Sequence, residues 1–65
     1  MKILLDKIMY SKNLTVRQVS IMTGIPKSTV NDIVNHKKMP RMDTMEKLAA
    51  GLKVKISDLY DSDYK

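Results

Sequence analysis

The stretch that decides the fold covers residues 15–35 and reads TVRQVSIMTGIPKSTVNDIVN. Thr15, followed three residues later by Gln18, is typical of a capping box, in which each side chain accepts a hydrogen bond from the other residue's backbone N–H. A helix is therefore predicted to begin at Val16. Gly24 can adopt the left-handed conformation that ends a helix, about eight residues later. A short helix followed by a tight turn is the first half of a helix-turn-helix.

The second half begins after Pro26, which suits a position at or just before the first residue of a helix. This helix is predicted over about residues 27–35. Its inward face is predicted to carry Val30, Ile33 and Val34, and its opposite face is polar: Ser28, Asn31, Asp32 and Asn35. These short polar side chains lower helix propensity. A face that enters the major groove of DNA and contacts base edges would explain why these residues are present despite their low helix propensity. An ordinary polar surface is the alternative.

The remaining segments also have helical apolar spacing, with no alternation long enough to predict a strand. Helices are expected over about residues 2–12 and 42–52, the latter with Met42, Met45, Leu48, Ala49 and Leu52 on one face. Pro40 bounds the loop before residue 42. A short turn over residues 56–60 precedes a tail, 61–65, that we expect to be frayed. The predicted fold is all-α: a compact bundle of about five short helices, with the helix-turn-helix at about residues 16–35.

Size and composition exclude several classes of protein. The chain has 65 residues, no cysteine and one histidine, so we expect one domain over residues 1–65, with no disulfide, no metal site and no cofactor. A chain this small has little room for an enzyme pocket, and no catalytic set can be assembled from its residues. Apolar runs are at most three residues long, far short of a membrane span or signal peptide. We expect a cytoplasmic protein that is not an enzyme.

Positive charge is concentrated in one half of the chain. Residues 11–41 contain six basic residues against the single acid Asp32, which accounts for the whole formal net charge of +5. The six are Lys12, Arg17, Lys27, Lys37, Lys38 and Arg41. Such asymmetry favours an anionic partner, with nucleic acid first and anionic lipid second. A solvated basic face that serves only solubility is the alternative.

Residues 14–60 resemble the lambda-repressor-like family, the Cro and phage-repressor type of helix-turn-helix regulators. The resemblance is carried by Leu14-Thr15, by the turn from Gly24 to Val30, by Pro40, and by the ending Leu52-Lys53-Val54 with Leu59-Tyr60. It implies a DNA-binding transcriptional regulator, most often a repressor, and adds weight to the all-α fold.

Family positions then suggest roles for individual residues. Lys27 and Ser28 occupy the main base-contact positions, and Asp32 lies one turn further along; Thr29 and Asn31 complete the predicted base-reading set. Asn35 matches an asparagine that holds a phosphate in several phage repressors, and Arg41 resembles a contact to the DNA backbone or the minor groove. Together with Asn35 and Arg41, three further basic residues are predicted to bind phosphates: Arg17, Lys37 and Lys38. Asp32 could accept a hydrogen bond from cytosine, act by negative selection, or lie beside a cation.

Three departures from the family pattern bear on this interpretation. Val16 replaces a glutamine that grips a phosphate, so that contact is in doubt. Met9 and Val34 stand where the family often has a buried Arg–Glu pair, and the joint change leaves no unpaired charge. His36 replaces the glycine that ends the recognition helix; histidine tolerates left-handed geometry better than most residues. We interpret it as an exposed loop residue within reach of Asp32 at i, i+4.

Two surfaces are candidates for protein contacts. A two-fold dimer on a palindromic operator is expected, with Ile56, Leu59, Tyr60 and Tyr64 as its exposed apolar interface. Ile21 and Met22 stand where the family usually has polar residues, and they either cover a neighbouring helix or form an exposed patch. In the second case the chain could be an antitoxin or antirepressor, which is a protein-interaction module on the same fold.

Overall fold

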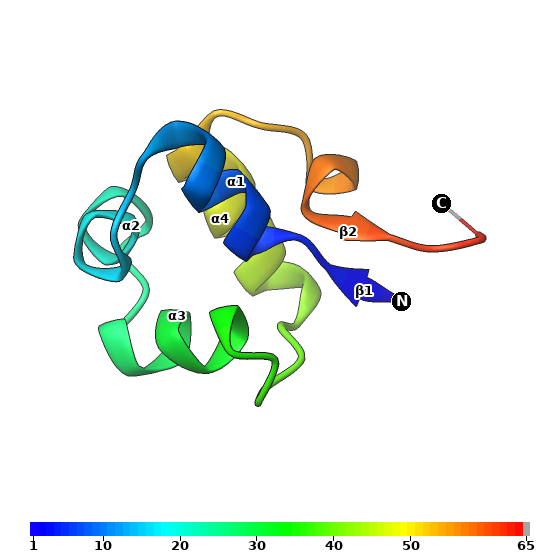
Figure 1. Cartoon of the computed structure of the whole chain (residues 1–65), viewed down its shortest axis with the longest axis horizontal. Coiled ribbons are helices and arrows are strands. Elements are labelled where there is room, and N and C mark those ends of the chain that lie inside the picture. The colour runs from blue at the N-terminus through cyan, green and yellow to red at the C-terminus, as the bar shows by residue number, and fades with distance from the viewer. Residues whose placement is uncertain (65) are drawn as a thin grey trace.

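The computed structural model describes residues 1–64 (Figure 1). Along the chain lie β1 (Lys2–Ile3), α1 (Leu5–Lys12), α2 (Val16–Thr23), α3 (Lys27–Val34), α4 (Met42–Leu52), the 3-10 helix η1 (Ile56–Leu59) and β2 (Tyr60–Asp61). The predicted all-α helical bundle is confirmed, with four α-helices and one 3-10 helix among the described residues.

The local signals at the ends of α2 act as predicted. The Thr15 hydroxyl oxygen accepts from the Gln18 N–H at 3.2 Å, and Gln18 Oε1 accepts from the Thr15 N–H at 2.8 Å. The helix begins at Val16 and ends at Thr23, and its C-cap residue is Gly24, which has a left-handed φ of 76°. This capping satisfies backbone groups that would otherwise lack partners. It also fixes the direction in which the chain enters the turn toward α3.

The first helix begins later than expected. It starts at Leu5 instead of near residue 2, because Lys2 and Ile3 form β1, which pairs antiparallel with β2 in the register Lys2 with Asp61 and Ile3 with Tyr60. Residue 61 was expected in the frayed tail. Two-residue strands carry no visible alternation, and their partners lie at opposite ends of the chain. The tail prediction for residue 65 lies outside the described residues.

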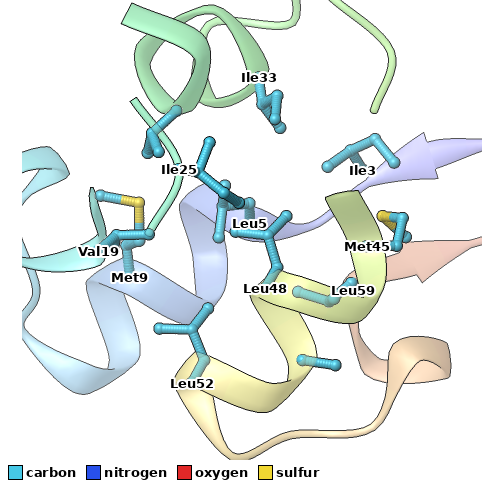
Figure 2. Close-up of a cluster of buried hydrophobic side chains, with 12 residues drawn as sticks. Ile3, Leu5, Met9, Val19, Ile25, Ile33, Met45, Leu48, Leu52 and Leu59 are labelled. Atoms are coloured by element: carbon cyan, nitrogen blue, oxygen red, sulfur yellow. The ribbon is translucent and has the colours of Figure 1, made fainter. Parts of the chain in front are cut away.

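The core lies among the four helices α1, α2, α3 and α4, with β1 and η1 closing one end (Figure 2). Twelve apolar side chains are buried among residues 1–64, and no polar or charged one is. Val30 and Ile33 are buried as predicted, and Met9 and Val34 join the core without a buried charge. Met42, predicted on the same face of α4 as Met45, is 64% exposed. It is the first residue of α4, and the buried part of this face begins one turn later, at Met45.

Helices α2 and α4 approach each other closely at Gly51. A Cβ atom at this position would lie 2.7 Å from the Met22 carbonyl oxygen and 2.7 Å from Thr23 Cγ2. Such distances leave no space for a methyl group. Nothing in the periodicity of residues 42–52 indicates this contact, because the partner atoms belong to another helix.

We therefore expect Gly51→Ala to destabilise the protein, although alanine is the better helix former by about 1 kcal/mol. Overpacking against backbone atoms costs about 1–3 kcal/mol, so the free energy of unfolding should fall. Urea denaturation measures this change. Glu46→Ala, at an exposed position of the same helix, is the control and should change stability by no more than about 0.5 kcal/mol. A Gly51→Ala variant as stable as the parent would contradict the close approach.

Candidate nucleic-acid interface

Helix α3 lies along one edge of the molecule, with its outer face directed away from α1 and α4 (Figure 1). Val30 and Ile33, which are 0% and 1% exposed, anchor its inner face in the core. α2 and α3 also pack against each other across the Gly24 turn. The outer face is thus held by a rigid scaffold while it stays open to a partner.

This outer face exposes the side chains of Lys27, Ser28 and Asn31. Thr29 and Asp32 are half-buried, so they lie at its margins. Asp32 forms no salt bridge with another residue of the described range, 1–64. The face therefore presents neutral donors and acceptors together with one lysine and one carboxylate.

Asn35 follows α3 as its C-cap residue. Its side-chain Nδ2 donates to Asn31 Oδ1 at 3.2 Å, and its backbone N–H donates to the Asn31 carbonyl oxygen at 3.0 Å. The phosphate contact that the resemblance implies for Asn35 would have to compete with the first of these bonds.

The four other predicted phosphate ligands are all exposed: Arg17, in the first turn of α2, and Lys37, Lys38 and Arg41, which follow α3. Arg41 Nε lies 3.5 Å from Asp43 Oδ1, with the two side chains 85% and 62% exposed. An ion pair this exposed contributes little to stability. The Arg41 guanidinium can therefore exchange Asp43 for a phosphate at little cost.

A hollow of about 340 Å³ lies between α3 and the start of α4. Its wall includes Thr29 and Ile33 on one side and Met39, Pro40 and Arg41 on the other. Met39, which is 57% exposed, was not predicted as a surface residue of this region. Only its place between two lysines and a proline could have indicated it, because such a loop cannot continue either helix.

The loop after α3 turns at His36. This residue has a left-handed φ of 59°, the geometry that we expected where the family has glycine. Its carboxylate partner is Asp6 and not Asp32: His36 Nε2 lies 3.7 Å from Asp6 Oδ2, at the start of α1. The positive φ ends the helical path, so the i, i+4 relation no longer holds. His36 therefore connects the end of α3 to α1.

The prediction that Leu59 belongs to an exposed dimer interface was wrong. Leu59 is 0% exposed and lies in the core, where its carbonyl oxygen also accepts from the Leu4 N–H at 2.8 Å. Its apolar side chain packs inside the core of one chain, so a second chain cannot contact it. Ile56 and Tyr60 are half-buried and pack against the core, and Tyr64 is 96% exposed.

The second apolar surface is exposed rather than covered. Ile21 is 76% and Met22 44% exposed on α2. Their residue types had allowed both outcomes. The face of α2 that packs on the core is carried by the buried Val19 instead.

A glycine turn between two short helices, with an exposed polar second helix and basic residues after it, defines a helix-turn-helix DNA-binding protein. A family model described as the Cro/C1-type HTH DNA-binding domain matches residues 4–63, and the chain belongs to this family. It is thus a transcription regulator that binds double-stranded DNA. Domains of this family are typically not enzymes.

No curated protein and no solved structure matches the chain. Within residues 1–64, none of the helices is long and apolar enough to span a bilayer.

Proposed function

We propose that the protein is a sequence-specific repressor that acts in the cytoplasm and binds its operator by placing α3 in the major groove. The observation that carries this proposal is the exposed outer face of α3, where Ser28 and Asn31 replace the long charged side chains that favour a solvated helix. The major groove is about 12 Å wide and admits one α-helix. α3 lies at one edge of the molecule, where its outer face is open to a partner (Figure 1).

Sequence recognition and anchoring use different residues in this proposal. Lys27, Ser28, Thr29, Asn31 and Asp32 contact base edges, with Asp32 accepting from a cytosine amino group or rejecting other bases. Arg17, Lys37, Lys38 and Arg41 bind phosphates, which set the register but carry no sequence information. Their exposure on α2 and on the segment after α3 supports this division.

The active form in this proposal is a two-fold dimer. One α3 contacts only a few base pairs, and two copies on half-sites about 34 Å apart would supply the missing affinity. The exposed ring of Tyr64 and the accessible parts of Ile56 and Tyr60 are the proposed contact surface. Repression then follows from occupation of a site that overlaps a promoter.

Selection from a randomised DNA duplex library, followed by sequencing at two salt concentrations, tests this function. We expect a palindromic motif and a steep loss of affinity at higher salt, because bound phosphates release counterions. Ser28→Ala should relax the preference at one position of each half-site, by about 1–3 kcal/mol. The absence of any enriched motif would reject sequence-specific binding.

A second candidate function is an antitoxin or antirepressor that binds a protein partner. The 76% exposure of Ile21, next to the partly exposed Met22, favours it, since neighbouring exposed apolar side chains can contribute to a protein-binding patch. Ile21→Ser, compared with Ser28→Ala in the DNA selection and in an assay of the protein's effect in cells, separates the two functions. A repressor keeps its motif and affinity in this variant, whereas a protein-interaction module loses its biological effect while Ser28→Ala retains it.

A further inference from the structure

The outer face of α3 contains a hydrogen bond between two exposed side chains. Asn35 Nδ2 donates to Asn31 Oδ1 at 3.2 Å. Residues four apart on a helix are neighbours, and the bond from the Asn35 N–H to the Asn31 carbonyl keeps Asn35 in helical register. The Asn35 amide is therefore directed back along the face, toward Asn31.

Helix stability does not explain this pair. Asparagine is a poorer helix former than glutamine, glutamate or lysine. Both side chains are exposed, so neither fills the core. A hydrogen bond between exposed side chains four apart stabilises a helix only slightly. The pair lies instead on the face that carries the proposed base contacts. There, the orientation of an amide decides which hydrogen-bond donors and acceptors face the DNA.

The bond determines what Asn31 can offer to DNA. An amide oxygen has two lone pairs and an amide nitrogen two N–H groups. Because Asn35 uses one lone pair of Asn31 Oδ1, one acceptor position and both donors of Asn31 remain. Adenine presents the matching pair in the major groove, an N6 donor and an N7 acceptor. Without an anchor, the terminal torsion of asparagine is broad and nearly two-fold, so oxygen and nitrogen would exchange places.

We infer that Asn35 is a positioning residue, which holds the Asn31 amide in the orientation that recognises adenine, instead of a ligand for a phosphate. This inference rests on the proposed function, because it assigns a base to one position of the operator. It departs from the role that the family resemblance implies for Asn35. The departure is supported by the observed direction of the Asn35 amide.

The test is a double-mutant cycle on the selected operator, with each of the four bases placed in turn at the position that Asn31→Ala affects. Asn31→Ala should reduce the preference for adenine there by about 5- to 150-fold. Asn35→Ala should remove most of the same preference while binding to random duplex changes by less than about twofold. The double variant should match Asn31→Ala, since two residues that act as one unit are not additive.

Two further variants distinguish a positioning residue from a phosphate ligand. Asn35→Gln keeps an N–H donor and should restore part of the adenine preference. Lys37→Ala, at an exposed position beyond the pair, represents a phosphate ligand: it should weaken binding to all sequences alike and reduce the salt slope by about one for each bound subunit. Circular dichroism of each variant verifies that the helical content of the chain is unchanged.

Three outcomes would overturn the inference. Asn35→Ala could weaken all duplexes equally and add to Asn31→Ala, as a phosphate ligand does; it could leave binding unchanged; or Asn31→Ala could affect a base other than adenine. Failure of the proposed function is distinct from these outcomes, because the parent protein itself would then bind every duplex with the same affinity.

Discussion

Replacing Leu59 by aspartate is expected to unfold the protein. The Leu59 side chain is 0% exposed and packs in the core near Leu48 and Met45 (Figure 2). The substitution removes apolar contacts and buries a carboxylate, and the core contains no polar partner for it. A large side chain lost from a core costs about 2–5 kcal/mol, and the unpaired charge adds to that. A domain of this length has only about 3–10 kcal/mol in total.

Thermal unfolding followed by circular dichroism measures this effect. Tyr64→Asp is the matched control, because the same charge is placed on a side chain that is 96% exposed. It should keep the parent's helicity and melting temperature. In sedimentation experiments it should also shift the proposed dimer toward the monomer. A folded, monomeric Leu59→Asp variant would instead show that Leu59 belongs to an interface.

The second large effect is expected from removal of three cations after α3. The triple variant Lys37→Ala, Lys38→Ala, Arg41→Ala should reduce the salt slope of DNA binding by about three for each bound subunit, since each phosphate contact contributes about 0.9. At about 0.15 M salt this corresponds to a loss of about 100-fold in affinity for each subunit. Specific and random duplexes should lose affinity alike, because phosphates carry no sequence information. Fluorescence anisotropy across a salt series measures both quantities.

The control for this experiment removes the same charge elsewhere. Lys7, Lys47 and Lys55 are exposed and lie outside residues 11–41. Replacing all three by alanine lowers the net charge equally but should change the salt slope by less than one. Equal losses in the two triple variants would mean that only the overall charge attracts DNA, with no defined phosphate-binding segment.

The locally encoded parts of the fold could be predicted with good accuracy. The start of α2, its end at Gly24 and the bounds of α4 all agree with the structure. These features depend on residues within about one helical turn of each other, as in the Thr15–Gln18 capping box. The family was also apparent from the same residues, and its model covers residues 4–63. Individual base and phosphate contacts remain predictions, because they depend on a DNA partner.

The sequence by itself therefore determined the all-α class, the helix-turn-helix and the polar outer face of α3. Only the tertiary structure decided that Leu59 belongs to the core, that Gly51 must remain a glycine, that His36 lies beside Asp6, and that Ile21 is exposed. Helix caps and periodicity arise from neighbours along the chain, so composition and spacing reveal them. Burial and close approach arise between residues far apart in sequence, and only the packing of the whole chain brings those together.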